Sequence, residues 1–128
     1  MRNLILLGGG GHCESVIAVI EMLSEFKIQG ILDPIYSKNN AQFILGYPIL
    51  GNDNKIEELK SKKLEFVITV GQIKSPSIRK KLFEKVKLVK GKLPIIISST
   101  AYVSKHTKVG EGTVVMNFSL SSASALDF

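Results

Sequence analysis

A run of four glycines followed by a histidine is the first feature of the sequence that could do chemistry. The glycines Gly8–Gly11 follow the apolar run Leu4–Leu7, and His12 comes directly after them. Apolar residues at helical spacing then continue from Val16 to Phe26. This order predicts a buried strand, a tight turn and a helix whose first backbone N–H groups have no partner within the helix. Such a helix N-terminus binds anions, most often phosphate, so the loop is a candidate phosphate site.

The elements around this loop are predicted to alternate between strands and helices. Strands are expected where the sequence is apolar and β-branched, and helices where apolar residues recur three or four apart after a capping residue. This alternation predicts an α/β fold with a parallel sheet and helices on both faces. The predicted strands are 4–7, 30–33, an edge strand at 47–51, 66–70 and 93–97; a loop is expected at 36–46, and helices after Gly11, after Asn52 or Asp53 and after Ser75, the last with Ile78, Leu82 and Val86 inward.

The last thirty residues follow a different period. A valine recurs every six residues, and a small hydroxyl residue follows each valine four positions later. A period of six is typical of a parallel β-helix, in which each hexad forms one side of a triangular coil. We therefore expect two parts, an α/β domain at 1–98 and the start of a β-helix at 99–128. The repeated residues are Val103, Val109 and Val115, with Thr107, Thr113 and Ser119.

In combination, these features resemble the bacterial sugar acetyltransferases of the sialic-acid O-acetyltransferase and UDP-amino-sugar N-acetyltransferase type. The shared features are the glycine loop with His12, Asp33 at the end of the second strand, Val70-Gly71 after a later strand, and the hexads. The resemblance implies a Rossmann-like N-terminal domain that holds a nucleotide sugar or sugar acceptor. It also implies a left-handed β-helix that forms a homotrimer and binds acetyl-CoA between subunits. The implied reaction is direct acetyl transfer to a sugar amine or hydroxyl, without a metal, for surface glycans.

The resemblance also assigns an acceptor site. Ligands of open parallel sheets bind outside the carboxyl ends of the strands, which is where the matching residues fall. Each residue has a structural alternative as well: a tight turn for the glycines, a turn residue for Asp33, a strand end for Gly71 and a solvated helix charge for Arg79. The implied site is Gly9, Gly10, Gly11 and His12 against the phosphates and sugar, Asp33 against the base or ribose, Gly71 and Gln72 on the other side of the crevice, and Arg79 reaching a phosphate.

The resemblance implies no catalytic residue in this chain. The family's catalytic histidine and its acetyl-CoA groove belong to later hexads, whereas His106 lies in the first hexad and is expected to be an exposed turn residue. The fourth hexad carries Ser121 where an aliphatic residue is due. We therefore expect the 128-residue chain to be truncated and to have no transferase activity of its own.

Composition limits the other classes of function. The formal charge of +6 suits anionic ligands, but the lysines are scattered over predicted helix surfaces without interleaved aromatic residues, which argues against nucleic acid. The single cysteine, Cys13, excludes an internal disulfide and a Cys-rich zinc site, and it fits the cytoplasm. No apolar run approaches the roughly 18 residues of a membrane helix, so membrane insertion is not expected.

Two alternatives stay open. The chain could be a non-catalytic nucleotide-sugar-binding or regulatory subunit. It could also be an NAD-dependent oxidoreductase, although the third glycine of the dinucleotide fingerprint falls on Cys13 and no dehydrogenase needs hexads. For the acceptor site, we expect His12→Ala and Asp33→Ala to weaken binding with little change in melting temperature.

Overall fold

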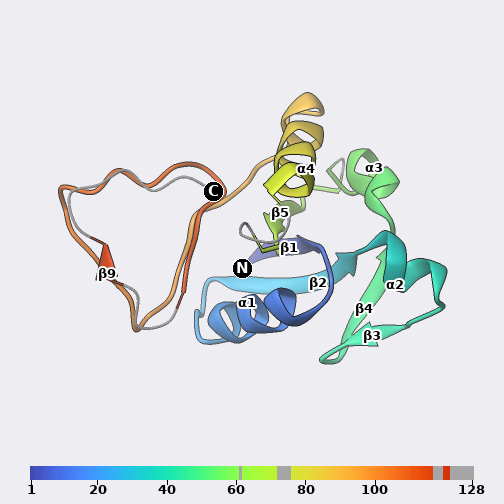
Figure 1. Ribbon diagram of the computed structural model, residues 1–128, viewed down its shortest axis with the longest axis horizontal. Helices are drawn as coiled ribbons and strands as arrows, with labels where there is room; N and C mark the ends of the chain where they lie inside the picture. The colour runs from blue at the N-terminus through green and yellow to red at the C-terminus, as the bar shows by residue number, and fades with distance from the viewer. Residues whose placement is uncertain (61, 72–75, 117–119, 122–128) are drawn as a thin grey trace.

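The fold is a five-stranded sheet with helices on both sides, followed by short paired strands at the C-terminal end (Figure 1). The computed structural model describes residues 1–60, 62–71, 76–116 and the main chain of 120–121. The strand order is β3-β4-β2-β1-β5. All neighbouring strands run parallel except β3, which pairs antiparallel with β4 at one edge. The strands are β1 (Arg2–Leu7), β2 (Phe26–Leu32), β3 (Phe43–Ile44), β4 (Tyr47–Gly51) and β5 (Glu65–Ile68).

The two faces of the sheet bury separate apolar clusters, because side chains alternate along each strand. On β1, Leu4 and Leu6 pack towards α1 (Gly11–Glu21), whereas Ile5 and Leu7 pack towards the other face. That other face is covered by α3 (Ile56–Lys60) and α4 (Pro76–Leu88). The expected α/β class, with a largely parallel sheet between helices, is therefore confirmed.

The first helix is shorter than its apolar spacing predicted. α1 ends at Glu21, and Phe26 opens β2 instead of closing the helix. Phe26 and Ile28 are buried while Lys27 between them is exposed, which is the alternation of a strand. The second strand therefore spans Phe26–Leu32 and not 30–33, because a period of two overrides the apparent helical spacing at its start.

The segment predicted as a loop at 36–46 contains two elements. Asp33 caps the short helix α2 (Pro34–Lys38), with Pro34 in its first turn. The strand β3 then pairs Phe43 with Pro48 of β4. β4 is consequently not the edge strand that its proline suggested, because β3 covers it on the outside.

The helix α3 begins as expected, but the inward face of α4 differs. Asn52 caps a short 3-10 helix, η1 (Asp53–Lys55), which leads directly into α3. On α4, Ile78 is 50% exposed, and Arg79 takes its place on the buried face with Leu82 and Val86. The interpretation of Arg79 as a solvated helix charge is therefore wrong, because this side chain is only 6% exposed.

The C-terminal strands pair with each other and do not extend the sheet. β6 (Ile96–Ile97) pairs in parallel with β8 (Val114–Val115), and β7 (Tyr102–Val103) pairs in parallel with β9 (Leu120–Ser121). Each residue pairs with the residue 18 positions later in the chain. The strand predicted at 93–97 is thus reduced to Ile96–Ile97, yet Ile96 is fully buried and packs into the cluster beneath α1. Ser119 lies outside the described residues.

Within the described part of the chain, no helix is both long enough and apolar enough to cross a bilayer.

Candidate functional site

The candidate site lies where the sheet reverses the direction of its winding. From β1 the chain passes through α1 to β2 on one side, and it later returns to place β5 on the other side of β1. The carboxyl ends of these three strands lead into the glycine loop, Asp33 and Gly71. In open parallel sheets this reversal opens a crevice that binds ligands.

The four loop glycines differ in what a side chain would meet at each position. A Cβ on Gly8 would lie 2.6 Å from Cγ1 of Val70, and a Cβ on Gly9 would lie 2.8 Å from Cδ1 of Ile44, so both are fixed by packing. Gly10 has a φ of +109°, which strongly favours glycine. At Gly11 a Cβ would meet nothing within 4 Å. Packing therefore does not require glycine at position 11, and the surface beside it at the start of α1 is open.

Asp33 ties the glycine loop to α2. Its Oδ2 accepts a 2.7 Å hydrogen bond from the amide of Gly9, and its Oδ1 accepts bonds of 2.9 Å from the amides of Ile35 and Tyr36. The amide of Asp33 itself donates to the carbonyl of Gly51, at 2.8 Å. The carboxylate is 9% exposed. It therefore acts as an N-cap and as a brace between the ends of β1 and β2.

Thr69, a residue that sequence reasoning did not single out, closes the floor of the loop. Its fully buried hydroxyl donates a 2.5 Å hydrogen bond to the carbonyl of Gly8 and also contacts the thiol of Cys13. Burial, the main cause, raises the pKa of Cys13 to about 11, so the thiol stays protonated at neutral pH. The sequence signal that could have singled out Thr69 is that it is one polar residue within an otherwise apolar run. Cys13 occupies the third glycine place of the dinucleotide fingerprint and packs in the core.

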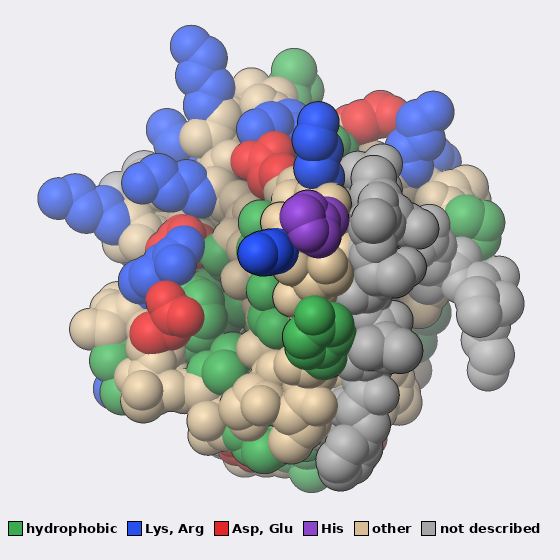
Figure 2. Space-filling view, turned by 90° about the vertical axis from the view of Figure 1, so that its left-hand side faces the viewer, with side chains coloured by type: hydrophobic (Ala, Val, Ile, Leu, Met, Phe, Trp, Pro, Cys, Tyr) green, Lys and Arg blue, Asp and Glu red, His purple; other side chains and the backbone are tan. Residues whose placement is uncertain are grey.

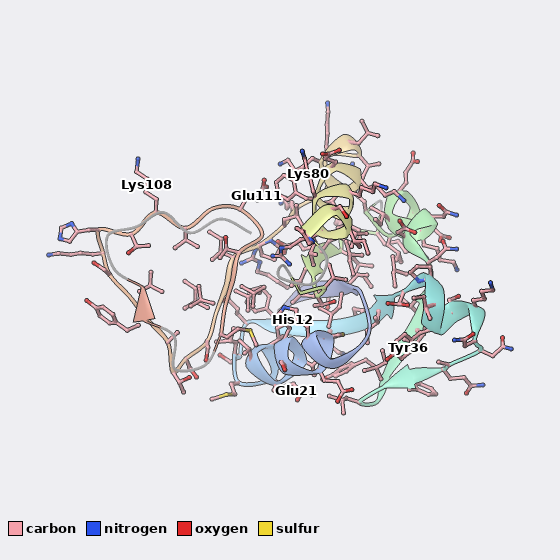
Figure 3. All side chains as sticks on the ribbon, in the orientation of Figure 1. His12, Glu21, Tyr36, Lys80, Lys108 and Glu111 are labelled. Atoms are coloured by element: carbon pink, nitrogen blue, oxygen red, sulfur yellow. The ribbon has the colours of Figure 1, made fainter. Side chains whose placement is uncertain are left out.

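His12 and Arg79 are electrostatically coupled beside the glycine loop. His12 is exposed in the first turn of α1 (Figure 3). Partial burial, and secondly the nearby charge of Arg79, lower the pKa of His12 below its usual value, which favours the neutral imidazole. Arg79 lies below, where its Nη1 donates to the carbonyls of Val70 at 3.1 Å and Ile68 at 3.3 Å. The guanidinium therefore holds the end of β5 and adds positive charge there.

The structure brings most of the expected residues to one edge of the sheet. Gly71 is half-buried just beyond Val70, and a Cβ on it would meet nothing within 4 Å. Gln72 lies outside the described residues. His106, which was expected to be an exposed turn residue, is exposed, and its amide donates to Oγ of Ser104 at 3.2 Å.

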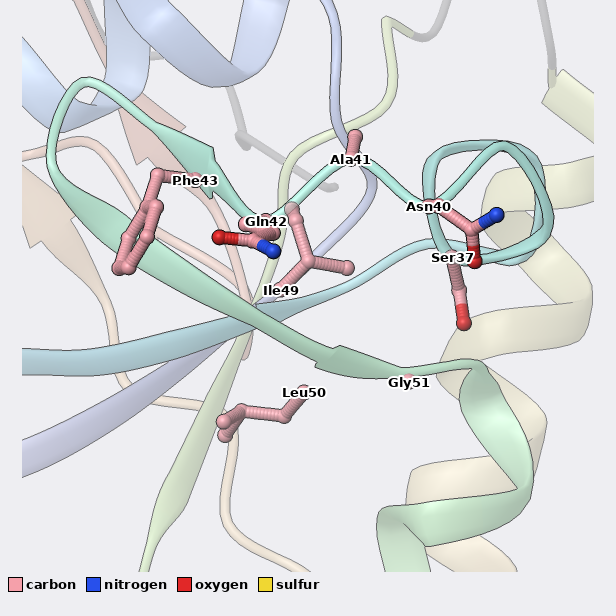
Figure 4. Close-up of a pocket in the computed structure, with 8 residues that line it drawn as sticks. All are labelled: Ser37, Asn40, Ala41, Gln42, Phe43, Ile49, Leu50 and Gly51. Atoms are coloured by element: carbon pink, nitrogen blue, oxygen red, sulfur yellow. The ribbon is translucent and has the colours of Figure 1, made fainter.

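A hollow of about 410 Å³ adjoins this edge on the side of β4 (Figure 4). It begins at Gly51, the residue whose carbonyl accepts from the amide of Asp33. The side chains of Asn40 and Gln42 bring amide groups to a wall that is otherwise partly apolar. Sequence reasoning missed it because the segment at 36–46 gave no sign of α2 and β3. The lining residues are Ser37, Asn40, Ala41, Gln42, Phe43, Ile49, Leu50 and Gly51.

The sheet order, the flanking helices and the glycine loop after β1 define a Rossmann-like α/β domain of the kind found at the front of sugar acetyltransferases. The chain belongs to the family of the PglD N-terminal domain, whose model matches residues 3–86. The family expected from the sequence is thereby confirmed.

Three relatives illustrate the family. The chain is 30% identical over 120 residues to the UDP-N-acetylbacillosamine N-acetyltransferase of Bacillus subtilis (strain 168), covering 91% of this chain and 52% of that protein. The acetyltransferase domain of PglB from Neisseria gonorrhoeae in complex with acetyl coenzyme A superposes with a TM-score of 0.83 at 26% identity, covering 98% of this chain and 59% of that one. PerB from Caulobacter crescentus in complex with CoA and GDP-perosamine gives a TM-score of 0.82 at 26% identity, covering 98% and 56%.

Structural relatives hold acetyl coenzyme A or CoA, so the expected cofactor is confirmed for the family. The chain spans a little over half the length of the relatives it matches.

Proposed function

We propose that this chain is the acceptor-binding part of an acetyl-CoA-dependent sugar acetyltransferase whose acceptor is a nucleotide-linked amino sugar. Membership of the family and likeness to a UDP-sugar enzyme and to a GDP-perosamine complex support this class of acceptor. The observation that carries the proposal is the hydrogen bond from the Gly9 amide to Asp33, with open space above Gly11. Together they leave the N-terminus of α1 accessible at the reversal point of the sheet.

The phosphates of the acceptor would lie against the amides of Gly10, Gly11 and His12. The first N–H groups of α1 have no acceptor within the helix, and Gly10 caps the helix without a side-chain hydrogen bond. The positive end of the helix dipole and the charge of Arg79 beneath the crevice favour an anion at this place. His12, whose lowered pKa favours the neutral imidazole, would donate or accept a hydrogen bond to the sugar or phosphate.

Asp33 would bind a ribose hydroxyl with its remaining acceptor capacity. A carboxylate offers about four lone-pair directions, and three are used by backbone amides. One direction stays available on Oδ2 for a ligand hydroxyl. Gly71 and Gln72 would border the crevice on the side of β5. The amides of Asn40 and Gln42 would meet the parts of the acceptor that extend beyond Asp33.

The second half of the proposal concerns the division of the chain at 98/99. We propose that 99–128 starts a left-handed β-helix, since an 18-residue register between parallel strands equals three hexads, one full coil. Of the described residues here, Tyr102, Lys105 and Lys108 are exposed. Homotrimer assembly and a cytoplasmic setting complete the proposal.

The direct test is calorimetric titration of the purified chain with a UDP-amino sugar and a GDP-amino sugar, with acetyl-CoA and NADH as parallel ligands. The proposal predicts heat from one of the nucleotide amino sugars. The matched variant is His12→Ala, which removes an exposed side chain at the expected phosphate position. Binding of NADH with no response to either sugar nucleotide would contradict the acceptor assignment.

A further inference from the structure

A second hollow, of about 470 Å³, lies at the opposite end of the sheet from the glycine loop. It is formed where the connection from α3 to β5 meets the connection from α4 to β6. Because β5 begins at Glu65, this is the amino end of the parallel strands, far from the carboxyl ends that frame the candidate acceptor site. The residues that line it are Lys60, Lys63, Leu64, Glu65, Lys90, Gly91 and Lys92.

Backbone contacts fix the walls of this hollow. The amide of Phe66 donates to the carbonyl of Lys92 at 2.9 Å, which holds the two connections side by side. At the end of α4, the amide of Gly91 donates to the carbonyl of Val86 and the amide of Lys90 donates to that of Lys87, at 2.9 and 3.0 Å. These two hydrogen bonds form a Schellman motif, which ends a helix in a defined geometry. The lysine backbones therefore have set positions around the hollow.

The residues that line the hollow carry a net positive charge. Four of its seven lining residues are lysines. The C-terminus of α4 offsets about half a unit of positive charge. Glu65 is already engaged by Arg2, whose Nη2 and Nε donate to it at 2.7 and 3.0 Å. Four lysines and Glu65 together give the lining a formal charge of +3, and the charge of Lys92 helps to lower the pKa of the Glu65 carboxyl. Lys and Arg side chains gather along the upper part of the face shown in Figure 2, with acidic groups among them.

Two of the lysines occupy backbone conformations that disfavour them. Lys63 has a φ of +62° and Lys90 a φ of +59°, both in the left-handed region that favours glycine. A side chain there costs about 1 kcal/mol relative to glycine. On backbone conformation alone, glycine would be the more stable residue at both positions.

We propose that this hollow binds a ligand with clustered phosphate groups, independently of the acceptor site. Four ammonium groups, one from the end of α3 and three from the two connections, can surround a compact polyanion and donate charge-assisted hydrogen bonds to several of its oxygens at once. The same chemistry is presented by a soluble polyphosphate and by anionic lipid headgroups.

The test uses inorganic tripolyphosphate and vesicles of equal amounts of phosphatidylcholine and phosphatidylglycerol, each titrated with the purified chain at low ionic strength. The variant is Lys63→Gly with Lys90→Gly, which removes two charges and relieves two strained conformations. We expect binding to weaken by about tenfold or more while the melting temperature is unchanged or higher. The control is Lys105→Gln with Lys108→Gln, an equal loss of charge on exposed residues outside the hollow, and it should alter binding by less than about twofold.

Binding of tripolyphosphate alone identifies a soluble ligand, and vesicle binding that tripolyphosphate displaces identifies a lipid headgroup; both support the site if the glycine variant loses them. Absence of binding to either probe overturns the proposal. It is also overturned if the control variant loses as much affinity as the glycine variant, because the attraction would then belong to the net charge of the chain.

Discussion

The amide of Gly9 donates a 2.7 Å hydrogen bond to Oδ2 of Asp33, and this contact joins the end of β1 to the end of β2. The same carboxylate caps α2 through its other oxygen. One buried side chain thereby fixes both the glycine loop and the neighbouring helix. The expectation that Asp33→Ala leaves the melting temperature almost unchanged is consequently replaced by a stability effect.

Asp33→Ala should lower the free energy of unfolding by about 2 kcal/mol. It removes an N-cap and leaves the amide of Gly9 without its acceptor in a poorly hydrated position. Urea denaturation measures the loss. The control is Glu84→Ala, an exposed acid on α4, which should change stability by less than about 0.5 kcal/mol. Equal losses in both variants would show that the brace contributes nothing particular.

Gly9→Ala and Gly11→Ala should have opposite effects on stability. At position 9 the added methyl meets Cδ1 of Ile44 at 2.8 Å and the ring of Tyr36 at 3.0 Å, so these side chains must move and the fold is destabilised. At position 11 the methyl meets nothing, and alanine should stabilise the helix by about 0.4–1 kcal/mol. Under the proposed function Gly11→Ala also weakens acceptor binding, because the methyl occupies ligand space. A stabilised variant with unchanged affinity for the acceptor would remove Gly11 from the site.

Arg79→Met should destabilise the chain by about 1–3 kcal/mol. The variant keeps much of the apolar stem but removes the donors to the carbonyls of Ile68 and Val70 at the end of β5. The matched control is Lys81→Met, an exposed cation on the same helix, which should be close to neutral. Thermal unfolding of the two variants gives the comparison, and an Arg79 variant as stable as the control would contradict the clamp.

His12 should make stability depend on pH. Its pKa is lowered in the folded chain, so the unfolded chain binds the proton more readily. The stabilisation is therefore present above the unfolded pKa of about 6.5 and is lost as pH falls from there towards the folded pKa. Between about pH 5 and 7, stability should rise more steeply in the wild type than in His12→Gln. If stability rises equally steeply with pH in both proteins, His12 does not contribute to the pH dependence.

The NMR titration of the His12 imidazole offers a second check on this electrostatic relationship. Its pKa should lie below about 6.5 and should rise only part of the way in Arg79→Met, because burial is the larger cause of the lowering and Arg79 the smaller. A pKa that does not move in the Arg79 variant would show that the two charges are not coupled.

The parts of the fold that could be predicted are those with a local signal. The glycine loop, the apolar β-branched strand of β5 and the capped start of α3 each carry their own pattern within a few residues. The same holds for the placement of Asp33, because strand ends in a parallel sheet share one edge.

The parts that could not be predicted depend on contacts between distant segments. The burial of Arg79 needs the carbonyls of Ile68 and Val70, which only the packing of α4 on β5 brings within reach. Phe26 continued the helical spacing of α1, and only pairing with Arg2 of β1 makes it a strand residue. The position of Lys63 and Lys90 around one hollow likewise follows from the assembled sheet.

The measurement that tests the central claim most directly is a set of ¹H–¹⁵N correlation spectra of the chain during titration with the nucleotide amino sugar that binds in calorimetry. The account predicts that the amide signals of Gly9, Gly10, Gly11 and His12 move together, with those of the Asp33 cap, and that Gly11→Ala reduces the affinity. Shifts confined to the lysine-lined hollow around Gly91, or a spectrum that responds to NADH and to no sugar nucleotide, would contradict the placement of the acceptor at the glycine loop.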